Sequence, residues 1–230
     1  NYDHVELNVS KRFYTSFFER GGKVYVRQYV DGIYCEDSFP ISPTLYIKSP
    51  KKNVDITAAH YNIYEEKIYP IEFESPKEAR DFVKTYKESG IDVYGYPRFA
   101  YTKIDELFPG VIDYDYDLLK IMGLDIETKV EYGFPNVITA NEEITLISAS
   151  YKGKVYTFAT KEWNRRDPNV VYVACSTEIE MLKRFMQFYS KLKPDVVTGW
   201  NTNGFDIPYV YNRICNLVDE KLANKLSPFG

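Results

Sequence analysis

Apolar positions in the second half of the chain recur at the spacings of strands and helices. Leu118–Thr128 is a short apolar run that ends in Asp125 and Glu127. Its length and polar end predict a strand that is buried on both faces. Further apolar runs predict strands at residues 144–151, 154–159, 170–174 and 195–200. Stripes at helical spacing predict helices between Thr177 and Pro194 and from Asp206 through Leu217.

The first half has the alternation of antiparallel strands. Gly21-Gly22 separates Phe13–Arg20 from Lys23–Val30 and predicts a hairpin. Ser75-Pro76-Lys77-Glu78 combines a capping box with a proline at the first helical position, so a helix is expected there, ending near Gly90. Residues 1–117 therefore read as an α+β domain of antiparallel strands and one helix, with an acidic connector at residues 110–117.

Residues 118–230 follow the order strand, hairpin of two strands, helix, strand, helix. A strand–helix–strand crossover requires parallel pairing, so this half is predicted to be α/β, with a mixed sheet and flanking helices. Ligands collect at the carboxyl ends of strands in such sheets. Asp125 and Glu127 lie at one such end, and the loop after Trp200 lies at another, which brings Asp206 within reach.

Composition narrows the class of protein. The 230 residues carry a net charge of -4, which excludes a basic coat for duplex DNA. Three widely spaced cysteines form neither a disulfide framework nor a zinc motif, so a reducing cytoplasm is expected, of the host if the protein is viral. No apolar run approaches 18 residues, and no membrane partner is expected.

Two carboxylates at the end of a strand have a chemical and a plain interpretation. Asp125 and Glu127 point the same way, with Cα atoms about 6.6 Å apart, and can grip cations. Alternatively, they are solvated acids at an exposed strand end. Asp206 at a helix start can equally be a cap, and Asn201 can simply hold a turn.

The combination of motifs is more specific than any one of them. DIET at residues 125–128, GFP at 133–135 and TGWNTNGFDIPYVYNR at 198–213 resemble the first two exonuclease motifs of family B DNA polymerases, above all those of T-even-type bacteriophages. The resemblance implies a ribonuclease-H-like fold for residues 118–230 and a 3′→5′ proofreading exonuclease. The first 117 residues resemble that family's N-terminal domain more loosely.

The same resemblance implies roles for six residues. Asp125, Glu127 and Asp206 match the carboxylates that hold two Mg²⁺ or Mn²⁺ ions around the scissile phosphate. Phe134, Asn201 and Phe205 match positions that contact single-stranded DNA or a frayed primer 3′ end. For the two phenylalanines, burial in the core is the alternative.

The family's last exonuclease motif, Tyr-x-x-x-Asp, is not found after Asp206, and no polymerase motif is present. We therefore expect an exonuclease domain truncated before its last motif, weak or inactive alone. Its expected partners are the C-terminal polymerase polypeptide and other replication proteins. Two alternatives remain: a non-catalytic module of a split polymerase for single-strand binding or assembly, and a ribonuclease-H-like nuclease acting on RNA.

Overall fold

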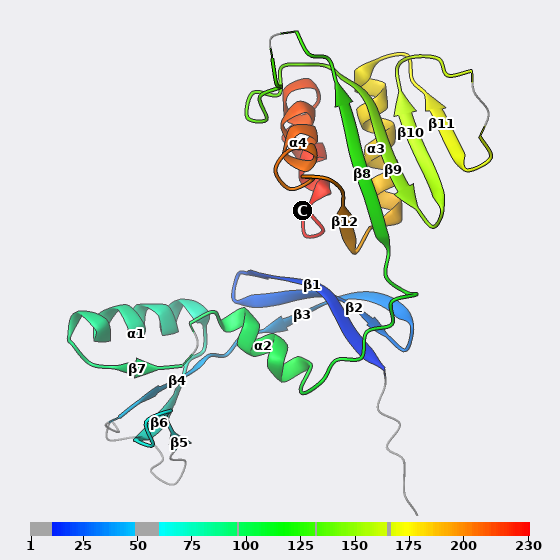
Figure 1. Cartoon of the computed structure of the whole chain (residues 1–230). Coiled ribbons are helices and arrows are strands. Elements are labelled where there is room, and N and C mark those ends of the chain that lie inside the picture. The colour runs from blue at the N-terminus through cyan, green and yellow to red at the C-terminus, as the bar shows by residue number, and fades with distance from the viewer. Residues whose placement is uncertain (1–10, 49–59, 96, 132, 165–166) are drawn as a thin grey trace, which may run out of the picture. The chain divides into compact units, whose positions relative to one another are not determined.

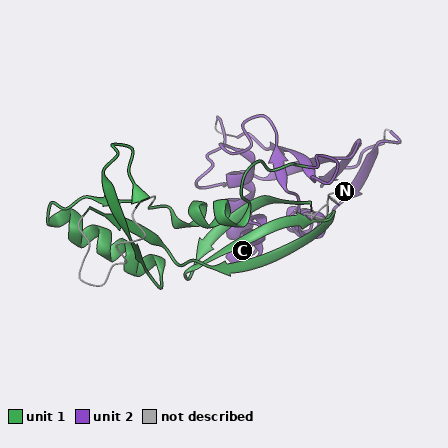
Figure 2. Ribbon diagram, turned by 90° about the horizontal axis from the view of Figure 1, so that it is seen from below, with its two compact units in different colours: residues 1–114 green, residues 115–230 purple. Residues whose placement is uncertain are grey.

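The computed structural model describes residues 11–48, 60–95, 97–131, 133–164 and 167–230. The chain divides into two compact units, Asn1–Tyr114 and Asp115–Gly230 (Figure 2). This division lies three residues before the boundary predicted at 117/118. Each unit is described by itself.

Unit 1 contains seven strands and two helices among its described residues (Figure 1). In chain order they are β1 (Arg12–Arg20), β2 (Lys23–Val30), β3 (Ile33–Pro40), β4 (Thr44–Ile47), β5 (His60–Tyr61), β6 (Lys67–Glu72), α1 (Pro76–Glu88), β7 (Val93–Tyr94) and α2 (Phe99–Leu107). The strands form two antiparallel sheets, ordered β1-β2-β3 and β5-β6-β4-β7.

Two local predictions for unit 1 are confirmed. The hairpin turns at Gly21-Gly22, and both glycines have positive φ, which residues with a side chain rarely adopt. The helix begins after Ser75, whose hydroxyl accepts from the backbone N–H of Glu78. The prediction of a single helix was wrong. α2 has no side-chain cap at its first turn, and the usual start signal is therefore missing from the sequence.

Unit 2 is built on one five-stranded sheet, ordered β11-β10-β9-β8-β12. Its elements are β8 (Ile121–Thr128), β9 (Ile144–Tyr151), β10 (Lys154–Ala159), β11 (Val170–Ala174), α3 (Glu178–Leu192), β12 (Val196–Thr198), α4 (Asp206–Leu217), α5 (Glu220–Ala223) and the 3-10 turn η2 (Asn224–Leu226). β12 runs parallel to β8 and β11 runs parallel to β10, whereas β9 is antiparallel to both of its neighbours. The predicted mixed sheet is confirmed.

The expectation that the central strand is buried on both faces was wrong. Met122, Leu124 and Ile126 are buried in one core together with residues of α3 and α4. Asp125 and Glu127, on the other side of β8, are exposed. The strand also begins at Ile121 instead of Leu118, because residues 115–119 form a turn. An apolar run alone does not distinguish one covered face from two.

Candidate functional site

The two acids of β8 lie on one face of the sheet, which we call the open face. Asp125 pairs with Ser148 of β9, and Glu127 pairs with Leu146. Both carboxylates are exposed. The strand alternation that the sequence predicted for these two residues is therefore present.

Asp206 reaches β8 between these two acids. Its Oδ1 accepts a hydrogen bond of 3.1 Å from the backbone N–H of Ile126, although 80 residues separate the two in sequence. The N-cap position belongs to Phe205, which makes no side-chain cap, and Asp206 is the first residue of α4. Its carboxylate therefore binds the strand, and the alternative that Asp206 serves as a plain helix cap was wrong.

Burial and charge both act on Asp206. The residue is 3% exposed, and burial raises the pKa of its carboxyl group. The N–H of Ile126 lowers this pKa, and the negative charge of Asp125 raises it again. Asp125 and Asp206 are thus close enough to interact electrostatically, as two groups that serve one site would be.

A glycine permits this approach. Thr198 of β12 pairs with Gly123 of β8, and Gly199 follows directly. A Cβ atom on Gly199 would lie 2.4 Å from the carbonyl oxygen of Leu124 and 2.3 Å from Thr202 Oγ1. Only a glycine lets the loop before α4 pass so close to the strand.

Asn201 shapes that loop. Its φ is 57°, and its carbonyl oxygen accepts from the N–H groups of Gly204 and Phe205, both at 2.9 Å. A Cβ on Gly204 would lie 2.4 Å from Asn201 Oδ1, so the asparagine side chain lies against the glycine. The structure thus shows Asn201 in a turn, and its contact with nucleic acid stays a prediction.

Aromatic rings gather beside the acids. Phe134 is 81% exposed, and its ring centroid lies 5.1 Å from that of Phe205. Phe205 is half-buried and lies 5.3 Å from the buried Tyr209. The alternative of core burial was wrong for Phe134 and holds partly for Phe205. Trp200, which was not predicted as a site residue, is 94% exposed in the loop after β12.

One face of α4 fixes the segment that follows Phe134. Side chains spaced three and four residues apart on this helix donate to five backbone carbonyl oxygens of residues 137–142. The bonds are Tyr209 Oη to Glu142 O (2.8 Å), Asn212 Nδ2 to Val137 O (2.9 Å), Arg213 Nη1 to Ala140 O (3.0 Å) and Asn141 O (2.8 Å), and Asn216 Nδ2 to Thr139 O (2.7 Å). Arg213 also makes two bonds, of 2.8 and 2.7 Å, to the carboxylate of Glu178. We call these side-chain bonds from α4 the clasp. The sequence analysis did not predict the clasp, although the spacing of polar residues within YVYNRICN was a signal for it.

A groove of about 450 Å³ extends from Glu127 across the open face. Hydroxyl groups form its floor, with Ser148 Oγ 3.4 Å from Thr157 Oγ1. Trp163 and Tyr172 form its far wall, with ring centroids 5.5 Å apart. The groove joins a carboxylate, hydroxyl groups and a tilted pair of aromatic rings, which is suitable for a nucleotide unit.

The three carboxylates have the oxygen donors that a hard divalent cation prefers, but they do not converge on a common metal position. Asp125, Glu127 and Asp206 offer oxygen atoms only, which suit Mg²⁺ or Mn²⁺. Within the described ranges, no three His, Cys, Asp or Glu side chains converge closely enough to hold a metal ion. One oxygen of Asp206 is already bonded to Ile126. The metal assignment therefore stays a prediction.

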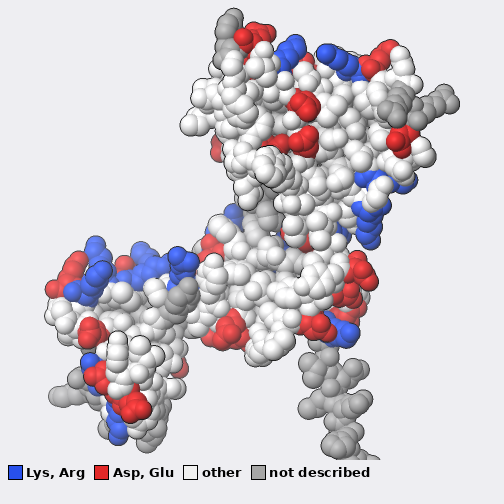
Figure 3. All heavy atoms as spheres, viewed as in Figure 1, with Lys and Arg blue, Asp and Glu red and all other residues white. Residues whose placement is uncertain are grey.

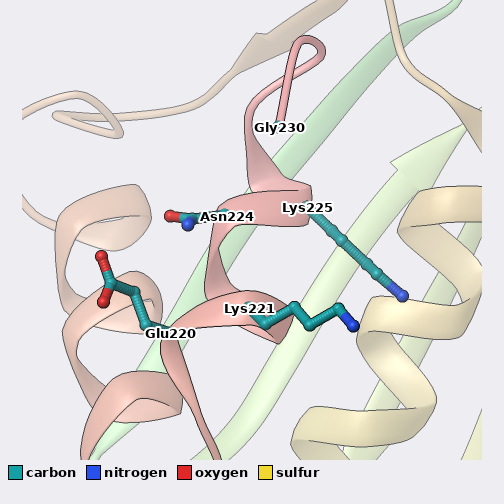
Figure 4. Close-up of a pocket in the computed structure, with 5 residues that line it drawn as sticks. All are labelled: Glu220, Lys221, Asn224, Lys225 and Gly230. Atoms are coloured by element: carbon teal, nitrogen blue, oxygen red, sulfur yellow. The ribbon is translucent and has the colours of Figure 1, made fainter.

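A second hollow, of about 460 Å³, lies at α5 and η2 (Figure 4). Lys221 and Lys225 project to one side of it, whereas Glu220 and Asn224 lie on the other. Its charged groups therefore do not converge on a common point.

All three cysteines, Cys35, Cys175 and Cys215, are free. None of the described helices has the length and apolar character needed to span a membrane.

Comparison with known proteins adds independent information. A sequence model of the family B DNA polymerase exonuclease domain matches residues 100–230. The DNA-directed DNA polymerases of Escherichia phage RB69 and Enterobacteria phage T4 are each 25% identical, over 95% and 96% of this chain. A DNA polymerase of Pyrococcus glycovorans is 32% identical over 71% of it. The chain spans 27% of the length of each phage relative and 20% of the archaeal one.

The family match includes all of unit 2 and thus the acids, the aromatic residues and the clasp described above. It covers more than half of the 230 residues. The chain therefore belongs to the family B DNA polymerases and carries the exonuclease domain of that family.

Proposed function

We propose that residues 118–230 form a 3′→5′ exonuclease that hydrolyses the terminal nucleotide of single-stranded or frayed primer DNA, as the proofreading part of a replicative polymerase. The observation that carries the proposal is the bond from Ile126 N–H to Asp206 Oδ1. It joins the two sequence motifs and brings the third carboxylate between Asp125 and Glu127. Family membership supports the same chemistry.

In this proposal, Asp125, Glu127 and Asp206 hold one or two divalent ions. Such ions, when bound, lower the pKa of a coordinated water and offset charge on the phosphate. The chain's own contribution begins before metal binds. Burial already raises the pKa of Asp206, so its negative charge is costly until a cation arrives. The exposed pair on β8 leaves the open face accessible to a phosphodiester.

The aromatic residues would orient the strand. Phe134 and Trp200 present open ring faces, and stacking on bases does not depend on sequence. The clasp from α4 fixes the backbone that follows Phe134, which limits the ordering cost when a base stacks there. Asn201 is proposed to contact the substrate from the same loop as Trp200. Further partners in this proposal are the C-terminal polymerase polypeptide and other replication proteins.

A second function is favoured by one observation. No described set of three carboxylates is close enough to hold a metal, so this chain can instead serve as a non-catalytic module for single-strand binding or polymerase assembly. The two functions differ in their response to metal. Only the exonuclease is expected to be stabilised against heat by Mn²⁺, because only it has a metal site that exists in the folded state.

A 3′-to-5′ cleavage assay tests the proposal. A 5′-labelled single-stranded oligonucleotide with Mn²⁺ should be shortened slowly by the 230-residue chain, and Asp125→Ala should reduce that rate by at least a hundredfold. Glu220→Ala, on α5, is the matched control and should leave the rate unchanged. Equal cleavage by the Asp125→Ala variant would refute the proposed site. No cleavage together with no Mn²⁺-dependent rise in Tm would favour the non-catalytic module.

A further inference from the structure

The outer side of α1 in unit 1 carries a row of cations. Lys77, Arg80, Lys84 and Lys87 are spaced by three, four and three residues, and all four are exposed. At about 100° per residue, they fall within an arc of roughly 80° on the helix. Figure 3 shows Lys and Arg gathered along this helix. The row extends over about 15 Å, given a rise of 1.5 Å per residue.

Most of these cations form no ion pair with the described residues of unit 1. Arg80 pairs with Glu19 of β1, and its guanidinium lies 5.6 Å from the ring centroid of Phe99. Lys77, Lys84 and Lys87 form no ion pair with any residue in the described part of the chain. The helix's own acids, Glu78, Asp81 and Glu88, fall outside the 80° arc. Asp81 and Glu88 each lie four residues from one of these lysines, but neither acid forms an ion pair with them. The three lysines are therefore exposed and unpaired, which favours an anionic partner.

The hairpin turn of β1 and β2 lies beside the start of this helix. A Cβ on Gly22 would lie 3.8 Å from Cδ of Pro76, the first residue of α1. Arg20 and Lys23 flank the turn and are exposed. This proximity therefore brings basic residues from two separate elements to neighbouring positions. A tertiary contact is needed to do this, and neither element alone would show it.

We propose that this surface, which we call the α1 basic surface, binds the backbone of single-stranded nucleic acid through its phosphates. Lysine binds phosphate as a point charge and reads no base, so the binding would not depend on sequence. A single row of charges on a convex helix matches one backbone, whereas a duplex presents two backbones across each groove. The proposal stands apart from the exonuclease because it needs neither a metal nor a carboxylate.

Binding of an oligonucleotide without metal tests this inference. The full chain is titrated against a fluorescent single-stranded oligonucleotide of about 20 thymidines in EDTA, where metal-dependent cleavage is absent, and anisotropy is read at several salt concentrations. Replacing Lys77, Lys84 and Lys87 together by Ala should weaken binding at least tenfold near 0.1 M salt. The slope of log K against log salt should fall by about 2, since each contact with a single strand contributes about 0.7.

Two matched variants give the result its meaning. Lys→Arg at the same three positions keeps the charge and should keep both affinity and slope. Lys183→Ala, Lys191→Ala and Lys221→Ala together remove three exposed helical lysines of unit 2 and should change little. Alanine suits an exposed helix, and circular dichroism checks that α1 is retained.

The proposal is overturned if the triple α1 variant binds the oligonucleotide like the unchanged chain, or if the unit 2 control loses as much affinity. A preference for duplex over single-stranded DNA would also overturn it. So would binding of poly-glutamate with no binding of the oligonucleotide, because the partner would then be an acidic protein segment. Loss of exonuclease activity in Asp125→Ala has no bearing on this measurement, so the two proposals can fail separately.

Discussion

The two faces of the unit 2 sheet differ in what they carry. On the covered face, Met122, Leu124 and Ile126 of β8 are buried with α3 and α4. On the open face, Asp125 and Glu127 of the same strand are exposed, beside a groove floored by hydroxyl groups. The two sets alternate residue by residue, so each face can change with little effect on the other.

Asp206 is the exception to this separation. It belongs to a helix of the covered face, but its carboxylate binds the backbone of β8 between the two exposed acids. Burial raises the pKa of the Asp206 carboxyl group. Its ionised form lowers the stability of the fold unless a cation or a proton compensates the charge. The buried face thus contributes one costly residue to the site, and the other buried residues there serve the fold.

The largest expected effect tests the covered face. Phe185→Ala in α3 should lower the free energy of unfolding by about 3–5 kcal/mol, because a fully buried aromatic ring leaves a cavity. Ser148→Ala on the open face is the control and should cost less than about 1 kcal/mol. Urea denaturation followed by tryptophan fluorescence measures both, since Trp163 and Trp200 lie in unit 2. Similar costs for the two variants would remove the distinction between the faces.

The clasp should have the next largest effect, because it connects the core to the segment near Phe134. Arg213→Met removes a partner from a pair with Glu178 in which both side chains are about a tenth exposed. It also leaves two backbone carbonyls without their donor. The expected loss is about 3 kcal/mol, measured by the same fluorescence.

The Arg213→Met variant should also show faster amide exchange in residues 137–142, measured by hydrogen-exchange mass spectrometry. A double variant with Glu178→Leu should lose less stability than the sum of the two single variants, since the pair is coupled. Additive losses and unchanged exchange would mean that the Arg213–Glu178 pair does not fix the segment.

Local signals predicted much of the fold. The spacing of apolar residues located β9, β10, β11 and α4 at their observed bounds, because turn or loop residues flank the strands and α4 has a strong helical stripe. Turn chemistry located the hairpin at Gly21-Gly22. The signals failed for α2, which has no side-chain cap, and for the exposed face of β8, since burial depends on what packs against a strand.

For the candidate site, too, the sequence predicted some features and missed others. The motifs named Asp125, Glu127 and Asp206, but only tertiary structure shows that Asp206 binds the strand at Ile126. The groove was missed because Trp163 lies in a loop and Tyr172 lies in β11. Only the folded sheet brings these two residues together. The α1 basic surface was missed for a related reason. The spacing of its lysines was visible in the sequence, but its continuity with the hairpin depends on the tertiary structure, which brings Gly22 beside Pro76.

The smallest expected effect concerns the start of α3, on the covered side of the sheet. The backbone N–H of Ser176 donates to Glu180 Oε2 at 2.8 Å, and this bond, followed by Arg184, holds the pKa of Glu180 below its ordinary value. A lowered pKa in the folded state adds stability above the unfolded value and loses it as pH falls through the folded value.

Glu180→Gln keeps a neutral acceptor, like the protonated acid, and so removes only the charged part of the interaction. Because the side chain of Glu180 is about a third exposed, the variant should be only slightly less stable than the unchanged chain at pH 7, and the gap in urea midpoint should close by about pH 3. Urea titrations followed by fluorescence at pH 7, 4.5 and 3 measure this gap. Because both proteins contain all the other carboxylates, the difference between them isolates the contribution of Glu180. A gap that is constant with pH would mean that the Glu180 side chain acts through packing and not through its charge.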